Sequence, residues 1–447
     1  MVSAQNITDY IEKEFTRFGF TKRQEVSRLL FEIAKRDQCH YLDILKDCTE
    51  GDFQFADLKK YLLQRRYPVL SQKKSSLRFP LTKLDIDPAN RANLSALKRF
   101  SNIYIEKKVA ESPLAKRVTD SFPEAKVEII DRYKEYFGKI QYSIQHYNQR
   151  KESLFIVKEE FDFFKRCPCS NDSVYCGLHV VNLGSGCPLE CGYCYLQGYI
   201  NSPGIILPGN IEDFFEQFKL YREKYRQDIR VGSGETTDSL VYDHITGFSA
   251  EIVNFFRKYP KSIFEFKTKT NNIDLLLTVN PLDNIIVSWT ISPERVVNSV
   301  EHFTASLQER LEAASKCADK GYKIGMHFDP IIYYANWEEE YHELVDQVFK
   351  HIPKERLAWF SVGTLRMTPK LRHVIENRFP EISILNEEFQ IGYDGKLRYD
   401  DQRRFEIYAK VKSWIRSYSK DIYIYLCMEE KVMCQSADIG PVKKYSS

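Results

Sequence analysis

Short apolar runs and longer amphipathic runs alternate from Val180 to about residue 380, and this alternation limits the possible folds most. The strand candidates are Val180–Leu183, Ile229–Val231, Ile263–Lys267, Asn284–Trp289, Lys323–Phe328 and Leu357–Val362. The helix candidates are Ile211–Tyr225, Ala250–Tyr259, Ile273–Leu277, Leu307–Lys320, Glu338–Phe349 and Pro369–Arg378. Six strand–helix units in succession predict an α/β fold whose parallel sheet forms a partial (βα)6 barrel of the TIM type. In such barrels the active site lies at the C-terminal ends of the strands.

Three cysteines, Cys187, Cys191 and Cys194, follow the first predicted strand with the spacing C-x3-C-x2-C. Three thiols within eight residues cannot all pair with one another as disulfides, but they can converge on one metal centre. A cubane iron–sulfur cluster normally takes four cysteine thiolates, so three would leave one iron open for chemistry. The alternative is a zinc loop, although zinc sites usually show paired C-x2-C motifs or histidine partners at fixed spacing.

A second group of cysteines, Cys167, Cys169 and Cys176, lies just before the first predicted strand. These residues could bind an auxiliary iron–sulfur cluster or zinc, with a fourth ligand such as Cys427 or Cys434. Alternatively they are free thiols, the more frequent fate of scattered cysteines. The remaining cysteines, Cys39, Cys48 and Cys317, have no useful spacing and are expected to be packing residues.

The length of 447 residues allows one large catalytic domain and a smaller one. No stretch approaches the run of about twenty apolar residues that spans a bilayer, and the first residues lack the features of an export signal. Membrane association is therefore not expected. The cysteines are sparse and clustered as in metal sites, which favours a reducing cytoplasm.

The first 175 residues are expected to form two regions before the barrel. Residues 1–95 are read as a helical region and basic linker, with a capping-box start at Thr21–Gln24 and a second helical run at Phe53–Leu63. Residues 96–175, with a strand-like run at Ile103–Ile105, lead into the cysteine region. Residues 176–447 are expected to form the barrel with a C-terminal extension.

Residues 58–120 contain far more Lys and Arg than Asp and Glu, although the whole chain has a net charge of only +3. Basic doublets such as Arg65–Arg66 and Lys73–Lys74 lie among aromatic residues. Such a stretch can bind a phosphate backbone without reading sequence. The alternative is an ordinary solvated surface and linker.

Several separated motifs resemble the radical S-adenosylmethionine (SAM) enzymes, and among these the spore photoproduct lyase family of DNA-repair lyases. They are Tyr193–Gln197 around the third cysteine, Thr236–Thr246, Lys267–Thr270, Ser288–Thr290 and Trp337–Tyr341. The resemblance covers roughly residues 100–425. It implies a radical-SAM-type barrel, a [4Fe–4S] cluster on the three cysteines, and SAM on the open iron. It also implies a 5′-deoxyadenosyl radical that abstracts hydrogen from a nucleobase of a thymine-dimer type lesion, with DNA as partner and flavodoxin or ferredoxin as electron donor.

The resemblance also implies roles for individual residues. The expected cofactor contacts are Gly234, Glu235, Thr237, Asp238, Lys269, Ser288 and Thr290, and Tyr193 and Tyr195 could return a hydrogen atom to the product. The family enzyme has a hydrogen-donating cysteine after its second strand, and Glu235 occupies that place here. A glutamate O–H bond is too strong for this role. Gly234–Glu235 instead resembles the Gly-Gly-Glu run that holds the methionine ammonium of SAM. A substrate role or a structural role for Glu235 remains open.

Possible substrate contacts follow the fifth and sixth predicted strands. His327 and Asp329 end the fifth strand, Arg366 follows the sixth, and Arg398–Tyr399 resembles an Arg-Tyr pair that the family places near its lesion. The alternatives are a hydrogen-bonded core histidine and arginines in surface salt bridges.

Two other functions compete with DNA repair. The missing family cysteine allows a radical SAM enzyme that modifies RNA, a peptide or a small molecule. A function of another class is a metal-stabilised nucleic-acid-binding protein without catalysis.

Overall fold

The computed structural model describes residues 3–46, 54–72, 81–94, 100–138, 140–160, 163–169 and 172–440. The chain divides into two compact units. The barrel unit contains residues 93–331, 336–364 and 405–447, and the N-terminal unit contains residues 1–92, 332–335 and 365–404. Among the described helices, none is both long and apolar enough to cross a membrane.

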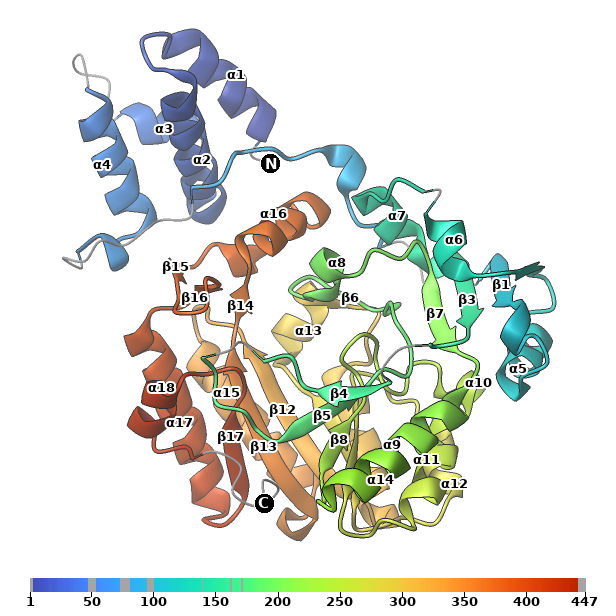
Figure 1. Ribbon diagram of the computed structural model, residues 1–447. Coiled ribbons are helices and arrows are strands. Elements are labelled where there is room, and N and C mark those ends of the chain that lie inside the picture. Colours follow the sequence, from blue (N-terminus) through green and yellow to red (C-terminus); the bar gives the residue numbers. More distant parts are fainter. Residues whose placement is uncertain are drawn as a thin grey trace. The chain divides into compact units, whose positions relative to one another are not determined.

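The barrel unit is built on an eight-stranded sheet that curls into a half-barrel (Figure 1). In sheet order its strands are β17 (Tyr423–Leu426), β13 (Leu357–Thr364), β12 (Lys323–Ile331), β10 (Ile285–Thr290), β9 (Ile263–Thr268), β8 (Arg230–Gly232), β5 (Leu178–Val181) and β4 (Phe164–Arg166). All neighbours are parallel except β4, which is antiparallel to β5. All six predicted strands are confirmed, and β17 and β4 extend the sheet at its two edges.

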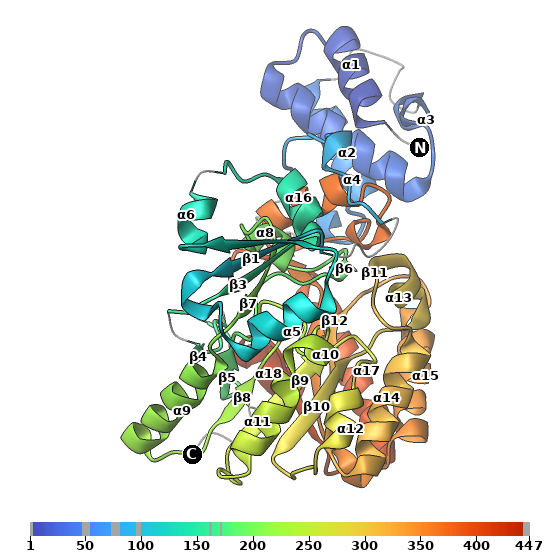
Figure 2. The same cartoon turned by 90° about the vertical axis from the view of Figure 1, so that its right-hand side faces the viewer.

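Helices cover the outer side of this sheet, as Figure 2 shows for α9, α11, α12 and α14. Helices α9 (Ile211–Tyr225) and α14 (Leu307–Lys320) have the predicted bounds, and α11 (Phe248–Phe256), α12 (Asp274–Thr278) and α15 (Trp337–His351) lie within a few residues of them. Helix α14 begins with a true capping box, in which Ser306 and Glu309 each accept a backbone N–H of the other. Its buried face includes Leu311, Ala314 and Cys317. The repeating apolar face explains why sequence periodicity located these helices.

A second parallel sheet lies in the same unit, with the strand order β2 (Lys126–Ile130), β1 (Asn102–Glu106), β3 (Ser153–Val157) and β7 (Ile205–Pro208). The run Ile103–Ile105 is therefore a strand, as expected. Strand β7 follows the cysteine loop, whereas the other three precede it. At Gly204, just before β7, a Cβ atom would lie 2.6 Å from the Phe155 ring. Only glycine allows β7 to approach β3 so closely.

The N-terminal unit begins with four helices, α1 (Ala4–Glu14), α2 (Phe20–Asp37), α3 (Tyr41–Lys46) and α4 (Phe55–Arg66). Their apolar faces share one core that includes Ile11, Leu29 and Leu62. The expected helices are thus present, but the capping box predicted at Thr21–Gln24 is wrong. Helix α2 begins at Phe20, and its N-cap, Gly19, has no side chain that could cap it.

The same unit includes β14 (Arg366–Met367), α16 (Pro369–Arg378), β15 (Gln390–Ile391) and β16 (Leu397–Arg398). The three strands form a small antiparallel sheet. Helix α16 has the predicted bounds, and the hydroxyl of its N-cap, Thr368, accepts the N–H of Leu371. These segments follow β13 in the chain.

Several described basic side chains of residues 58–120 contact carboxylates. Arg66 is buried and bonded to Glu32, and Arg65 contacts Asp37 at 3.4 Å. Lys73 and Lys74, which belong to the predicted basic stretch, lie outside the described residues, as does Cys48. A contribution of this stretch to nucleic-acid affinity stays a prediction.

Candidate active site

The cysteine loop follows β5 at the C-terminal end of the half-barrel, as the sequence predicted. Cys191 lies on β6 (Glu190–Cys191), which pairs with β11 (Glu301–His302). Ser185 and Ile206 exchange two backbone hydrogen bonds of 2.8 Å, which join the loop to β7. Cys187, Cys191 and Cys194 are all free thiols, the first two buried and the third half-buried.

Arg150 holds the backbone of this loop from within the protein. Its guanidinium, fully buried, donates to the carbonyl oxygens of Cys187 (2.9 Å) and Leu189 (3.1 Å). It also pairs with the Glu190 carboxylate at 2.9 Å, and Lys151 lies 3.3 Å from the same carboxylate. A buried arginine with three anchored partners fixes the loop before any ligand binds.

The electrostatic surroundings of the three thiols suit a thiolate-bound cluster. Burial raises the pKa of Cys187 to about 12, and burial likewise raises the pKa of Cys191 and Cys194. The cation of Lys269 acts in the opposite direction on Cys191 and Cys194. Cluster binding requires deprotonated sulfurs, so nearby cations stabilise the form that binds iron. Three thiols on one short loop, with such a cation nearby, therefore have the chemistry that a cluster with one open iron requires.

Glu301 organises the side of the loop that faces β11. Its carboxylate accepts hydrogen bonds from the Tyr193 hydroxyl and from Ser292 (3.0 Å). Arg310 lies 2.7 Å from one carboxylate oxygen and Lys269 lies 3.6 Å from the other. Burial alone would raise the pKa of Glu301, but the charges of Lys269 and Arg310 lower it to about 2. The hydrogen bond to Glu301 thus fixes the Tyr193 side chain, and no sequence motif indicated this role of Glu301.

We expect Glu301 to make the folded protein sensitive to acid. Its pKa falls from 4.5 to about 2 on folding, so its stabilisation is fully present above pH 4.5 and is lost as pH falls towards 2. A shift of this size corresponds to a free energy of unfolding of about 3 kcal/mol. In cluster-free protein, denaturant unfolding between pH 5 and 2 should show a smaller pH dependence for Glu301→Gln than for the parent. Equal slopes would contradict this role.

Gly234 and Glu235 follow β8. Gly234 has a φ of +94°, and a Cβ there would lie 2.9 Å from the Ser239 hydroxyl, so the position requires glycine. The Tyr195 hydroxyl donates to the carbonyl oxygen of Glu235. One carboxylate oxygen of Glu235 is buried without a hydrogen bond from the described residues, and the Lys165 ammonium lies 3.7 Å from it. This carboxylate is available to a cationic ligand group.

Thr237 and Asp238 join the same loop to its neighbours. The Thr237 hydroxyl lies 3.3 Å from the carbonyl oxygen of Gly186 in the cysteine loop. The half-buried Asp238 residue accepts, through its carboxylate, the backbone N–H of Lys269 (2.7 Å) and the hydroxyl of Thr268 (2.7 Å). These two residues therefore hold the cysteine loop, the loop after β8 and the end of β9 together.

Ser288 and His327 meet inside the barrel at Glu265. Both lie 2.7 Å from one oxygen of the Glu265 carboxylate, and Arg230 lies 2.7 Å from the other. Burial would raise the pKa of Glu265, but Arg230 and His327 hold it below its ordinary value. His327 is thus a buried, hydrogen-bonded histidine, as in the alternative that the sequence analysis gave for it. Thr290, the next inward position after Ser288, is buried, and its carbonyl oxygen accepts from Arg310 at 3.0 Å.

The second group of cysteines lies beside the last strand. The sulfurs of Cys167 and Cys169 are 3.7 Å apart. The segment that leads to Cys176 pairs with residues 429–430 through a backbone hydrogen bond of 2.8 Å and a bridge. The hydrogen bond with Cys169 raises the pKa of Cys167, and the charges of Cys427 and Cys176 add to it. As the described side chains stand, no three His, Cys, Asp or Glu residues are gathered tightly enough to hold a metal ion.

The remaining candidate contacts lie in or after β12 and in the N-terminal unit. Asp329 is a half-buried residue near the end of β12. Arg366 pairs with Arg398 in the β14–β16 ladder. Arg398 is buried and contacts the Asp394 carboxylate at 2.8 Å, and the buried Tyr399 hydroxyl accepts the N–H of Tyr333. Arg398 and Tyr399 are therefore packed against their own unit.

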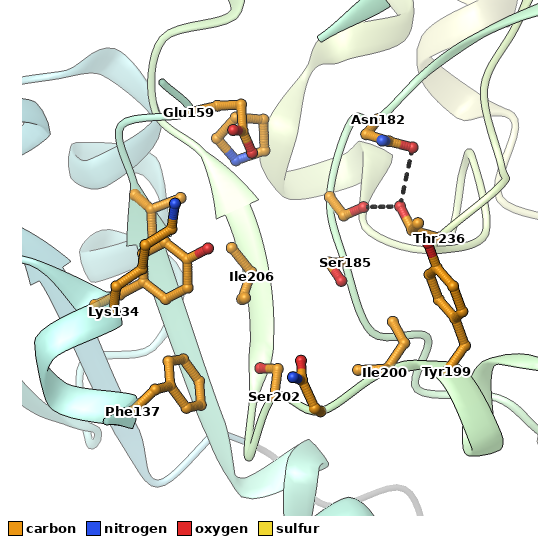
Figure 3. A pocket seen from close by; sticks show the side chains of 15 residues that line it. Lys134, Phe137, Glu159, Asn182, Ser185, Tyr199, Ile200, Ser202, Ile206 and Thr236 are labelled. Carbon is orange, nitrogen blue, oxygen red and sulfur yellow. Dashed lines mark hydrogen bonds between the residues drawn. The ribbon is translucent and has the colours of Figure 1, made fainter. Parts of the chain in front are cut away.

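A pocket of about 460 Å³ lies between the second sheet and the residues that flank the cysteine loop (Figure 3). Its lining is partly aromatic, with Tyr133, Phe137 and Tyr199, and partly polar, with Asn182 and Thr236. Thr236 and Asn182 are joined by a hydrogen bond of 3.2 Å on one wall. The volume is within the range of sites for small organic ligands.

A half-barrel of parallel strands with three cysteines on the loop after its first parallel strand is the arrangement of the radical SAM enzymes, the class that includes the spore photoproduct lyases. The chain belongs to the spore photoproduct lyase family, whose model matches residues 98–425. Residues 1–97 lie outside this match.

The chain is 29% identical to the spore photoproduct lyase of Clostridium acetobutylicum over 323 residues, which are 69% of this chain and 93% of the relative. It is 26% identical to the spore photoproduct lyase of Bacillus subtilis over 332 residues, or 71% and 94%. Among solved structures, a mutant spore photoproduct lyase with bound AdoMet and dinucleoside spore photoproduct matches with a TM-score of 0.65 at 24% identity. The match covers 74% of this chain and all of that chain, and it confirms the fold.

Proposed function

We propose that this protein is a radical SAM lyase that repairs a thymine-dimer type lesion in DNA. The observation that carries the proposal is the cysteine loop, held by Arg150 at the C-terminal end of β5 in a chain of the spore photoproduct lyase family. Cys187, Cys191 and Cys194 would hold a [4Fe–4S] cluster whose open iron binds SAM. When bound, the cluster and SAM supply a 5′-deoxyadenosyl radical that abstracts a hydrogen atom from the lesion.

The chain's own residues would bind and orient the reactants and exclude water. Lys269 and Arg150 compensate the negative charge of the thiolates. Of the two tyrosines that could return a hydrogen atom, we propose Tyr195, because its side chain is 48% exposed beside Glu235. Tyr193, by contrast, is buried. A base in duplex DNA would have to be flipped out to reach this site.

Replacing Glu235 by Gln should weaken SAM binding about tenfold to a hundredfold, because a charge-assisted hydrogen bond contributes about 1.5–3 kcal/mol. The Gln side chain keeps the size of Glu but cannot pair with the SAM ammonium as an anion. Glu235→Cys should also weaken SAM binding and should not simply yield a better repair enzyme. Calorimetric titration of SAM measures both effects. SAM affinity equal to that of the parent, with product formation alone reduced, would assign Glu235 to the substrate instead.

We also propose that Cys167, Cys169, Cys176 and Cys427 hold a second metal, since thiolate sets of this size suit zinc or an iron–sulfur cluster. The contacts near residues 429–430 favour Cys427 over Cys434 as the fourth ligand. Metal analysis should show loss of the additional metal in Cys427→Ser and its retention in Cys434→Ser. Identical metal contents in the parent and in Cys427→Ser would refute this site.

We propose a reducing cytoplasm as the location, because the ten described cysteines form no disulfide. We propose flavodoxin or ferredoxin as the electron donor, because the cluster needs a low-potential electron.

Glu235 in place of the family cysteine supports a second candidate function, a radical SAM enzyme that acts on RNA, a peptide or a small molecule. The family's lyase activity argues against a non-catalytic binding protein. Anaerobic incubation with SAM, reductant and an oligonucleotide containing spore photoproduct separates the candidates. Mass analysis should show two restored thymines, and an unchanged oligonucleotide would favour the second candidate.

A further inference from the structure

The N-terminal unit combines two kinds of chain segment. Residues 1–92 lie outside the family match, whereas residues 332–335 and 365–404 directly follow β12 and β13 of the barrel. In barrels of parallel strands, the segments after the C-terminal strand ends supply substrate contacts. The helices outside the family match therefore fold together with two segments of the kind that carries substrate contacts.

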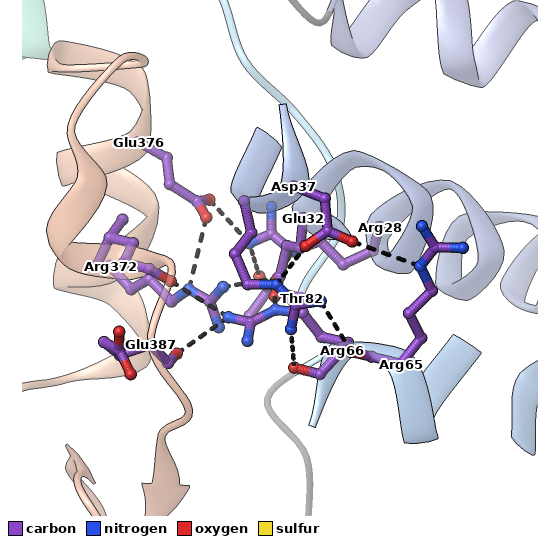
Figure 4. Close-up of polar contacts among 11 residues, drawn as sticks. Arg28, Glu32, Asp37, Arg65, Arg66, Thr82, Arg372, Glu376 and Glu387 are labelled. Atoms are coloured by element: carbon purple, nitrogen blue, oxygen red, sulfur yellow. Dashed lines mark hydrogen bonds and ion pairs between the residues drawn. The ribbon is translucent and has the colours of Figure 1, made fainter. Parts of the chain in front are cut away.

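A buried ionic cluster centred on Glu32 of α2 joins these segments (Figure 4). The Glu32 carboxylate contacts Arg28 (2.9 Å) and Arg66 (2.6 Å) from the N-terminal helices, and Arg372 (2.6 Å) from α16. Arg28 also contacts Glu376 of α16 at 2.8 Å. All five side chains are at most 5% exposed. Three guanidinium groups thus share one carboxylate of α2.

Further bonds connect α4 and the residues after it to the segment that follows α16. Arg66 donates to the carbonyl oxygen of Glu387 at 3.0 Å. The Glu388 carboxylate accepts the backbone N–H groups of Val69 (3.1 Å) and Leu70 (2.8 Å). Because carboxylates and guanidinium groups in these positions are withdrawn from water, removing one partner leaves an uncompensated charge.

The segment after β12 belongs to the same assembly. The backbone N–H of Tyr333 donates to the Tyr399 hydroxyl at 3.0 Å, and the Arg403 guanidinium lies 4.0 Å from the centre of the Tyr333 ring. Tyr399 is buried in this unit next to Arg398. A shift of the 365–404 segment would therefore move both segments that follow the strand ends.

We propose that the N-terminal helices brace the segments after β12 and β13, and that Glu32 is a positioning residue for the candidate lesion contact Arg366 on β14, which is paired with Arg398. The bracing itself rests on the contacts above, and the effect on lesion binding rests on the proposed function. Glu32 touches no substrate in this account and acts through α16.

The test compares Glu32→Gln with a matched control, Glu25→Gln. Glu25 lies on the same helix, is 24% exposed and pairs with Lys59 of α4 at 2.7 Å. In Glu32→Gln, hydrogen exchange of amides in residues 365–404 should accelerate about a hundredfold, as expected when a buried ion network loses its carboxylate. The KM for lesion DNA should rise about tenfold or more, because the contacts are misplaced. Iron content and SAM affinity should match those of the parent, and Glu25→Gln should match the parent throughout.

Glu376→Gln provides a milder variant in case Glu32→Gln does not fold, and it should accelerate the same amides from the α16 side. Parent-like exchange in both variants would overturn the bracing. Accelerated exchange with an unchanged KM would overturn the positioning role. If the parent protein does not bind lesion DNA at all, the proposed function fails, and the exchange result alone still decides the bracing.

Discussion

Replacing Cys187, Cys191 or Cys194 by alanine should remove the iron–sulfur cluster and abolish SAM cleavage. Each thiolate is one of only three protein ligands in the proposed site, so losing one leaves two irons without protein ligands. The backbone of the loop should persist, because Arg150 binds it through carbonyl oxygens rather than through the thiols. Iron analysis and the yield of 5′-deoxyadenosine under reductant measure the two effects.

Cys39→Ala is the matched control for these variants. Cys39 is a half-buried free thiol packed against the core of the N-terminal helices. This variant should retain the iron and the SAM cleavage of the parent. Full SAM cleavage by any one of the three loop variants would refute the proposed cluster site.

Replacing Arg150 by methionine should destabilise the cysteine loop by about 3–5 kcal/mol, because a buried ion pair loses one partner. Glu190 would lose its 2.9 Å partner, and the carbonyl oxygens of Cys187 and Leu189 would lose the donors that Arg150 supplies. We therefore expect a lower melting temperature and a cluster that is lost on gel filtration. Differential scanning calorimetry and iron content after chromatography test this expectation.

Arg132→Met is the control for Arg150. Arg132 has the same charge and length, but its side chain is 48% exposed and pairs with Glu160 at the surface. Exposed pairs contribute about 0–1 kcal/mol, so this variant should behave like the parent. Equal melting temperatures for Arg150→Met and the parent would show that the loop does not depend on Arg150.

Local patterns in the sequence were sufficient to predict the strands and several helices of the half-barrel. The six strands and the helices α9, α14 and α16 were located because apolar residues recur with the period of each element. The second sheet was not predicted as a sheet, because β7 is separated from β1, β2 and β3 by the cysteine loop. Strand β17 was missed because it comes after a long helix and outside the regular strand–helix alternation.

The cysteine loop was predicted because its three residues are close together in sequence. Glu301, Arg150 and Glu265 were missed for the opposite reason. The partners of Glu301 include Tyr193, 108 residues earlier, and Glu265 joins Arg230 to His327 across 35 and 62 residues. The sequence around a buried charged residue does not differ from that around an exposed one. Only the folded structure therefore shows that such a residue binds several partners.

The same reasoning applies to the N-terminal unit. Amphipathic spacing predicted its helices, but nothing in the sequence links Glu32 to Arg372, which is 340 residues away. The basic residues of positions 58–120 looked like a candidate nucleic-acid surface. In the structure Arg66 is instead a buried partner of Glu32.

The most direct test of this account follows a hydrogen isotope from substrate to cofactor. The cluster-loaded protein is incubated anaerobically with SAM, reductant and an oligonucleotide whose spore photoproduct carries deuterium in its thymine residues. The account predicts that deuterium appears in 5′-deoxyadenosine while the lesion is converted to two thymines. Formation of 5′-deoxyadenosine without deuterium, with the lesion intact, would contradict the account.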